Sequence, residues 1–158
     1  MKTKGFKLNP LLKLVLLISI GALFISGVAW IIVNCFFYTD SDYGITPSPL
    51  EPIFLSAHGV IAPIFLIAFG ALFPSHISKT YKAKANLKNG ILLLTIIFIL
   101  IVSGYLLYYA GSDGIRRYSS LIHSVLGVIL VPAIYLHIVT GKNFILNRKN
   151  SKNKRSYP

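Results

Sequence analysis

The sequence predicts an all-α integral membrane protein, a four-helix bundle with up-down-up-down topology. Hydrophobic residues make up 54% of the 158 residues and charged residues only 13%, whereas a typical soluble domain contains about 25% charged residues. Four apolar stretches each have the roughly 20 residues that a helix needs to cross a bilayer. They cover residues 11–37, 52–73, 88–110 and 118–140, and we expect them to form one membrane domain, residues 1–142.

The connections between these spans support the predicted topology. The first span runs to residue 37 without a cleavage signal, so we expect a retained anchor instead of a signal peptide. Residues 38–51 are rich in Gly, Pro, Ser and Asp, which favour turns over regular structure. The third connection, residues 111–117, is short, so the third and fourth spans must be antiparallel neighbours. Residues 143–158 form a basic tail that we expect to be disordered, and no internal repeat is evident.

Charge is distributed unevenly between the two sides of the predicted bundle. Fourteen of the 16 Lys and Arg residues lie in the N-terminal segment, the second connection and the tail, whereas all four acidic residues lie in the first and third connections. By the positive-inside rule, both termini are cytoplasmic. The net charge of +12 therefore predicts contact with anionic lipid head groups, and not with nucleic acid.

All four histidines lie on the second and fourth spans. His58 and His76 belong to the second span, and His123 and His137 belong to the fourth. An ionisable residue inside a membrane span is expensive, which makes each of them a functional candidate. On an α-helix, the 18 residues from His58 to His76 make about five full turns. The 14 residues from His123 to His137 leave an angle of about 40°, so each helix is expected to present two imidazoles on one side.

The predicted topology pairs these histidines by depth. The second and fourth spans run in the same direction and face each other across the bundle core, where such bundles hold cofactors. His58 is then level with His123 near the outer surface, and His76 is level with His137 near the inner surface. Two imidazoles on opposite sides of a flat macrocycle are the bis-histidine ligation of b-type haem. The sequence therefore predicts two non-covalent haem b groups, and Gly127, one turn after His123, would leave room for a porphyrin.

The inner pair fits this geometry less well than the outer pair. A rise of about 1.5 Å per residue separates His58 from His76 by roughly 27 Å, but His123 from His137 by only roughly 21 Å. Pro74 could kink the helix and absorb the difference, or His76 could be a loop residue, leaving only the outer pair. Another interpretation is that the histidines only form hydrogen bonds between helices. Metal-ion transport is disfavoured because the spans contain no carboxylate.

Residues 51–142 resemble a known family. The elements that carry the resemblance are His58-Gly59, Pro74-Ser75-His76, Ser103-Gly104-Tyr105, His123 with Gly127, and His137 before Gly141-Lys142. In these elements the chain is similar to bacterial four-helix b-type cytochromes of the DUF4405 group, also called flavinylation-associated cytochromes. Their plan is similar to that of cytochrome b561-like and formate dehydrogenase gamma-type membrane subunits. The resemblance implies two haem b groups, electron transfer and a bacterial inner (plasma) membrane location, whereas the first span matches only in being hydrophobic.

The leading hypothesis is a transmembrane di-haem b-type cytochrome. It would transfer electrons between a quinone or cytoplasmic-side donor and a redox partner at the outer face. Arg116 and Arg117, just above the outer pair, are candidates for binding haem propionates, with two solvated loop cations as the alternative. A stand-alone enzyme is less favoured because the spans contain no acid, base or nucleophile set. The alternatives are a quinone or metal reductase acting alone and a haem-free membrane anchor subunit.

Overall fold

The structure, a computed structural model, describes residues 9–41, 44–82, 84 and 86–154, and 87% of it is helical. The predicted all-α class is therefore confirmed. The chain divides after Ser78 into two compact units, and each is described by itself. The N-terminal lysines at positions 2, 4 and 7 and the last four residues of the predicted tail lie outside the described residues.

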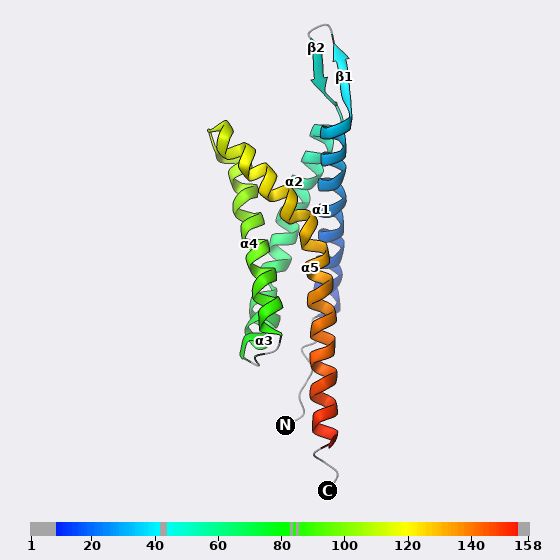
Figure 1. The fold of residues 1–158 in the computed structure, drawn as a ribbon, viewed down its shortest axis with the longest axis vertical. Helices are drawn as coiled ribbons and strands as arrows, with labels where there is room; N and C mark the ends of the chain where they lie inside the picture. Colours follow the sequence, from blue (N-terminus) through cyan, green and yellow to red (C-terminus); the bar gives the residue numbers. More distant parts are fainter. Residues whose placement is uncertain (1–8, 42–43, 83, 85, 155–158) are drawn as a thin grey trace. The chain divides into compact units, whose positions relative to one another are not determined.

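The first unit is a helical hairpin made by α1 (Pro10–Phe36) and α2 (Glu51–Gly70), which pack along each other (Figure 1). Asn9 caps the start of α1, because its side-chain oxygen accepts a hydrogen bond from the backbone N–H of Leu11 at 2.9 Å. Pro10 follows at the first helical position, where its missing N–H costs nothing. At the far end of the unit, the amide of Asn34 donates to a carboxylate oxygen of Glu51 at 3.2 Å and links the two helices.

The connection between α1 and α2 is more regular than predicted. It contains an antiparallel hairpin of β1 (Tyr38–Ser41) and β2 (Gly44–Pro47), in which Thr39 pairs with Thr46. The turn-forming Ser48 and Pro49 follow β2, while Tyr38, Thr39, Ile45 and Thr46 are types that favour strands. The expectation of an irregular loop is therefore wrong for the two strands.

The helix that carries His76 changes its winding before it ends. After α2, residues Phe73–Ile77 form a single π-helical segment, η1, and α3 (Ser78–Lys82) continues from it. Pro74 lies inside η1 and has no N–H to continue the α-helical hydrogen-bond pattern. His76 is thus part of a helix, not of a loop. A π-turn takes up about one residue more than an α-turn, so the winding at His76 departs from the ideal helix on which the shared face with His58 was predicted. That shared face stays a prediction.

The second unit contains α4 (Leu87–Tyr109) and α5 (Asp113–Lys154), joined by a tight turn (Figure 1). α5 begins five residues before the predicted span and includes most of the predicted tail, so the expectation that residues 143–154 are disordered is wrong. Asp113 lies in its first turn, where a negative charge favours a helix start. No glycine or proline follows Gly141 before Pro158, and Leu, Lys and Arg are good helix formers, so nothing in the sequence ends the helix earlier.

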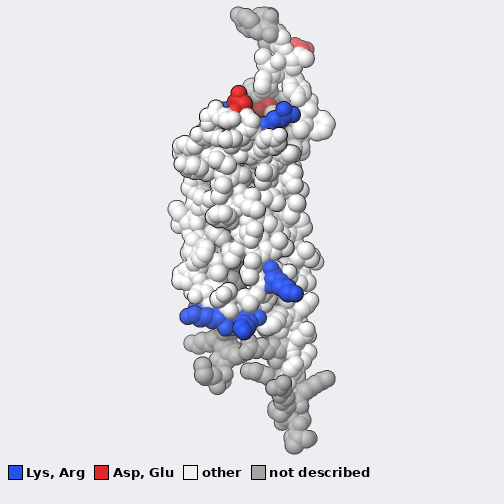
Figure 2. All heavy atoms as spheres, turned by 60° about the vertical axis from the view of Figure 1, so that its left-hand side comes forward, with Lys and Arg blue, Asp and Glu red and all other residues white. Residues whose placement is uncertain are grey.

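Within the described residues, four helical segments are long and apolar enough to cross a membrane: Pro10–Phe36, Glu51–Lys82, Leu87–Tyr109 and Asp113–Asn147. Most of their large apolar side chains are exposed at the protein surface. On the face shown in Figure 2, the charged side chains lie near the ends of the helices and the stretch between them is uncharged. The predicted number of spans is therefore matched by four helices of suitable length and composition.

Candidate functional site

His58 on α2 forms a hydrogen bond with a serine of α1 within the first unit. Its Nδ1 atom lies 3.0 Å from the hydroxyl oxygen of Ser26. The next residue of α1 is Gly27, and a Cβ added there would lie 3.4 Å from the Cε1 atom of His58. The imidazole therefore packs directly on the backbone of α1, at a position where a glycine leaves it room.

His123 on α5 is held in the same way within the second unit. Its Nδ1 atom lies 3.0 Å from the hydroxyl oxygen of Ser103 on α4. A Cβ added to Gly104 would lie 3.3 Å from the Cε1 atom of His123. Each of the two histidines predicted to form the outer pair therefore contacts a Ser-Gly dipeptide on the preceding helix.

Each serine hydroxyl lies within hydrogen-bond distance of both its own helix and the imidazole. The hydroxyl of Ser26 lies 2.8 Å from the carbonyl oxygen of Ala22, and that of Ser103 lies 2.7 Å from the carbonyl oxygen of Ile99. When the hydroxyl donates its single hydrogen to that carbonyl, its oxygen can accept a hydrogen bond from the imidazole. In that arrangement Nδ1 bears the proton, and in a neutral ring Nε2 bears the lone pair.

The two units repeat one arrangement, which the sequence analysis did not detect. In both, the Ser-Gly pair lies 17 residues after an asparagine, Asn9 or Asn86, and the first helix starts directly after that asparagine. The signal was present in the sequence as the dipeptides Ser26-Gly27 and Ser103-Gly104. The repeat is hard to recognise in the sequence because the separation from serine to histidine differs: it is 32 residues in the first unit and 20 in the second. The longer separation accommodates the β1–β2 hairpin.

His137 contacts α4 fourteen residues further along α5. A Cβ at Gly90 would lie 3.7 Å from its Cε1 atom. Gly90 also precedes Gly104 by 14 residues, so the two imidazoles keep one antiparallel register along the hairpin. The contact at His137 therefore resembles that at His123 in the glycine over which the ring lies.

Two asparagines of α4 fix the end of the hairpin beside His137. The amide of Asn86 donates to the carbonyl oxygen of His137 at 3.1 Å and to the hydroxyl of Thr140 at 2.9 Å. The amide of Asn89 donates to the same hydroxyl at 2.9 Å. Gly141 allows this approach, since a Cβ there would lie 3.7 Å from the Asn86 amide nitrogen. These residues make the second unit more polar at this end than elsewhere along its interface.

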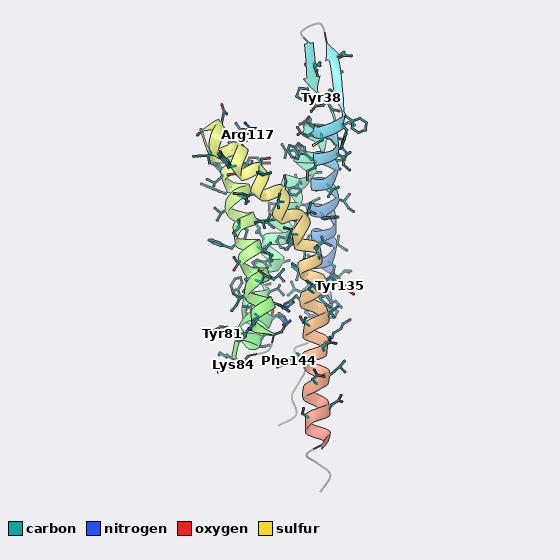
Figure 3. The ribbon with its side chains drawn as sticks, in the orientation of Figure 1. Tyr38, Tyr81, Lys84, Arg117, Tyr135 and Phe144 are labelled. Carbon is teal, nitrogen blue, oxygen red and sulfur yellow. The ribbon has the colours of Figure 1, made fainter. Side chains whose placement is uncertain are left out.

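The remaining predicted site residues lie at the start and middle of α5. Arg116 and Arg117 are exposed and belong to the first turns of the helix, so the prediction that they are loop residues is wrong (Figure 3). Arg116 precedes His123 by seven residues, about two turns, and so shares its side of the helix. A Cβ at Gly127 would meet no heavy atom within 4 Å.

The four histidines were predicted to bind metal in the form of haem iron. Among the described residues, no group of three or more His, Cys, Asp or Glu side chains could hold a metal ion. In sequence and structure comparisons, no family model, curated protein or solved structure matches the chain. The fold therefore defines the chain as a protein of four apolar helices in two hairpins, and the resemblance to flavinylation-associated cytochromes stays a prediction.

Proposed function

We propose that this chain is a membrane-spanning b-type cytochrome that transfers single electrons through two haem groups. The observation that carries the proposal is the contact of Nδ1 of His58 with Ser26 and of Nδ1 of His123 with Ser103, each at 3.0 Å. With the proton on Nδ1, such a contact leaves the Nε2 lone pair as the donor that an axial iron ligand must supply. Haem iron, when bound, supplies a one-electron redox couple whose potential depends on its axial ligands.

The proposal assigns distinct tasks to the protein's own residues. His58 and His123 are the ligands of the outer haem, with Gly127 leaving room for the macrocycle and Arg116 placed to bind a propionate. His76 and His137 are the ligands of the inner haem. The packing of His137 on Gly90 supports its place in this second pair, and His76 lies in the π-helical segment η1.

The environment of both haems follows from the apolar helices. The four spans insert in a bacterial inner membrane with both termini in the cytoplasm, because the basic residues then lie on the inside. Lipid covers the exposed apolar side chains, and the absence of charged residues from the middle of the helices provides a low dielectric. The donor is a quinone or a protein on the cytoplasmic side, and the acceptor is a redox partner at the outer face.

A reduced-minus-oxidised absorption spectrum of the detergent-purified protein tests the proposal. We expect the sharp bands of low-spin b-type haem and two haems per chain in a haem assay. His123→Leu and His58→Leu should each remove one haem, while Tyr135→Leu on the exposed side of α5 should remove none. A chain without haem after expression with sufficient haem supply would instead be a membrane anchor subunit. Turnover of a quinone or metal by the purified protein alone would identify a reductase.

A further inference from the structure

We infer that Ser26 and Ser103 are positioning residues that set the redox potential and the retention of the outer haem. This inference rests on the proposed function, because it concerns the ligands His58 and His123. Neither serine would touch the iron. Each acts through the imidazole that it holds, and the two act as an equivalent pair because the two helical hairpins repeat the same contact.

The two serines differ from the other buried serine of α1. Ser19 lies two turns from Ser26, is also buried, and donates to the carbonyl oxygen of Leu16 of its own helix at 3.2 Å. Ser26 and Ser103 are only 6% and 4% exposed and combine the helix hydrogen bond with an imidazole contact at 3.0 Å. If these hydroxyls only formed a hydrogen bond within their own helix, a histidine would not be needed opposite the serine in both units.

The bond to the serine controls the ligand in two ways. It fixes the rotation of the imidazole, because Nδ1 is held by the hydroxyl while Cε1 rests over the neighbouring glycine. It also raises the basicity of the ring, since a hydrogen bond accepted from Nδ1–H increases the electron density at Nε2. A more basic ligand favours ferric over ferrous iron and so lowers the redox potential.

The test compares Ser26→Ala and Ser103→Ala with Ser26→Thr and Ser103→Thr. Threonine keeps a hydroxyl that can bond the same helix carbonyl, and Ser19→Ala is the matched control. We expect each alanine variant to lose haem about 10 to 100 times more readily to a haem-accepting competitor, as is typical when the partner of a metal-bound histidine is removed. The midpoint potential of the outer haem should rise, and the threonine variants and Ser19→Ala should retain wild-type values.

A second measurement does not depend on haem. In the haem-free protein, nitrogen NMR of labelled histidines should report the Nδ1–H tautomer for two rings, and each serine-to-alanine change should shift the signals of one of them. Unchanged potential, retention and tautomer in both alanine variants would overturn the inference. Threonine variants that behave like the alanine variants would overturn it too, since packing alone would then explain the effect. Wild-type protein without haem bands would instead refute the proposed function, and the tautomer signals would still decide the role of the serines.

Discussion

Replacing Gly27 with valine tests whether the close packing of His58 on α1 is needed for the site. A Cβ at this position would lie 3.4 Å from the Cε1 atom of His58, which is already below the optimal separation of about 3.5–4.0 Å for carbon atoms. The two further methyl groups of valine would have to displace the imidazole. Overpacking of this kind costs about 1–3 kcal/mol.

The displaced ring also affects the hydrogen bond to Ser26. The Nδ1–Oγ distance is 3.0 Å, so a shift of about half an ångström brings it to the limit of a useful hydrogen bond. Losing that bond costs roughly another 1 kcal/mol. We therefore expect a lower midpoint of thermal unfolding in detergent, followed by circular dichroism, and a loss of the outer haem in the haem-per-chain assay.

The matched control for Gly27→Val lies on the same helix. A Cβ at Gly21 would meet no heavy atom within 4 Å, so Gly21→Val changes the helix propensity in the same way without touching a histidine. Gly104→Val in the second unit should reproduce the effect of Gly27→Val, because its Cβ would lie 3.3 Å from His123. If Gly27→Val and Gly21→Val had equal unfolding midpoints and full haem content, the close packing would have no part in ligand placement.

Three further predictions concern other parts of the chain. Gly127→Leu should leave the unfolding midpoint of the haem-free protein unchanged, since no atom lies within 4 Å of the new Cβ, yet lower the haem content; equal haem content would contradict the space assigned to the porphyrin. Asn86→Gly keeps the left-handed backbone (φ 51°) but removes two hydrogen bonds to α5, so unfolding in denaturant should become easier by about 1–3 kcal/mol. In a Cys35→Ser background, an impermeant thiol reagent added to intact cells should label Asp40→Cys and not Lys82→Cys; the reverse pattern would invert the predicted orientation.

The sequence predicted the helices well because their signal is a long run of apolar residues. It predicted their ends poorly where a local contact decides the outcome. α5 starts at Asp113, which favours the start of a helix, although the apolar stretch begins later. The segment before His76 has an apolar sequence like that of the rest of α2, yet its winding changes at Phe73–Ile77, where Pro74 lies. Counting residues along an ideal helix therefore did not anticipate the change of winding at His76.

The histidines were found from sequence, but the serines that hold them were not. Ser26 and Ser103 are unremarkable in sequence, since serine and glycine are common in membrane helices. Their role follows from the register between two antiparallel helices, and the register depends on the length of the connection. One connection contains a β-hairpin and the other only a tight turn, so equal contacts occur at unequal separations. The contacts themselves were needed to identify the repeat.

The contact of each Ser-Gly pair with its histidine also has a consequence for how a cofactor would be bound. Both imidazoles are in contact with residues of their own helical hairpin, so in the proposed cytochrome each would be oriented without help from the other hairpin. Binding of the proposed cofactor would then have to immobilise fewer side chains, which lowers its entropic cost.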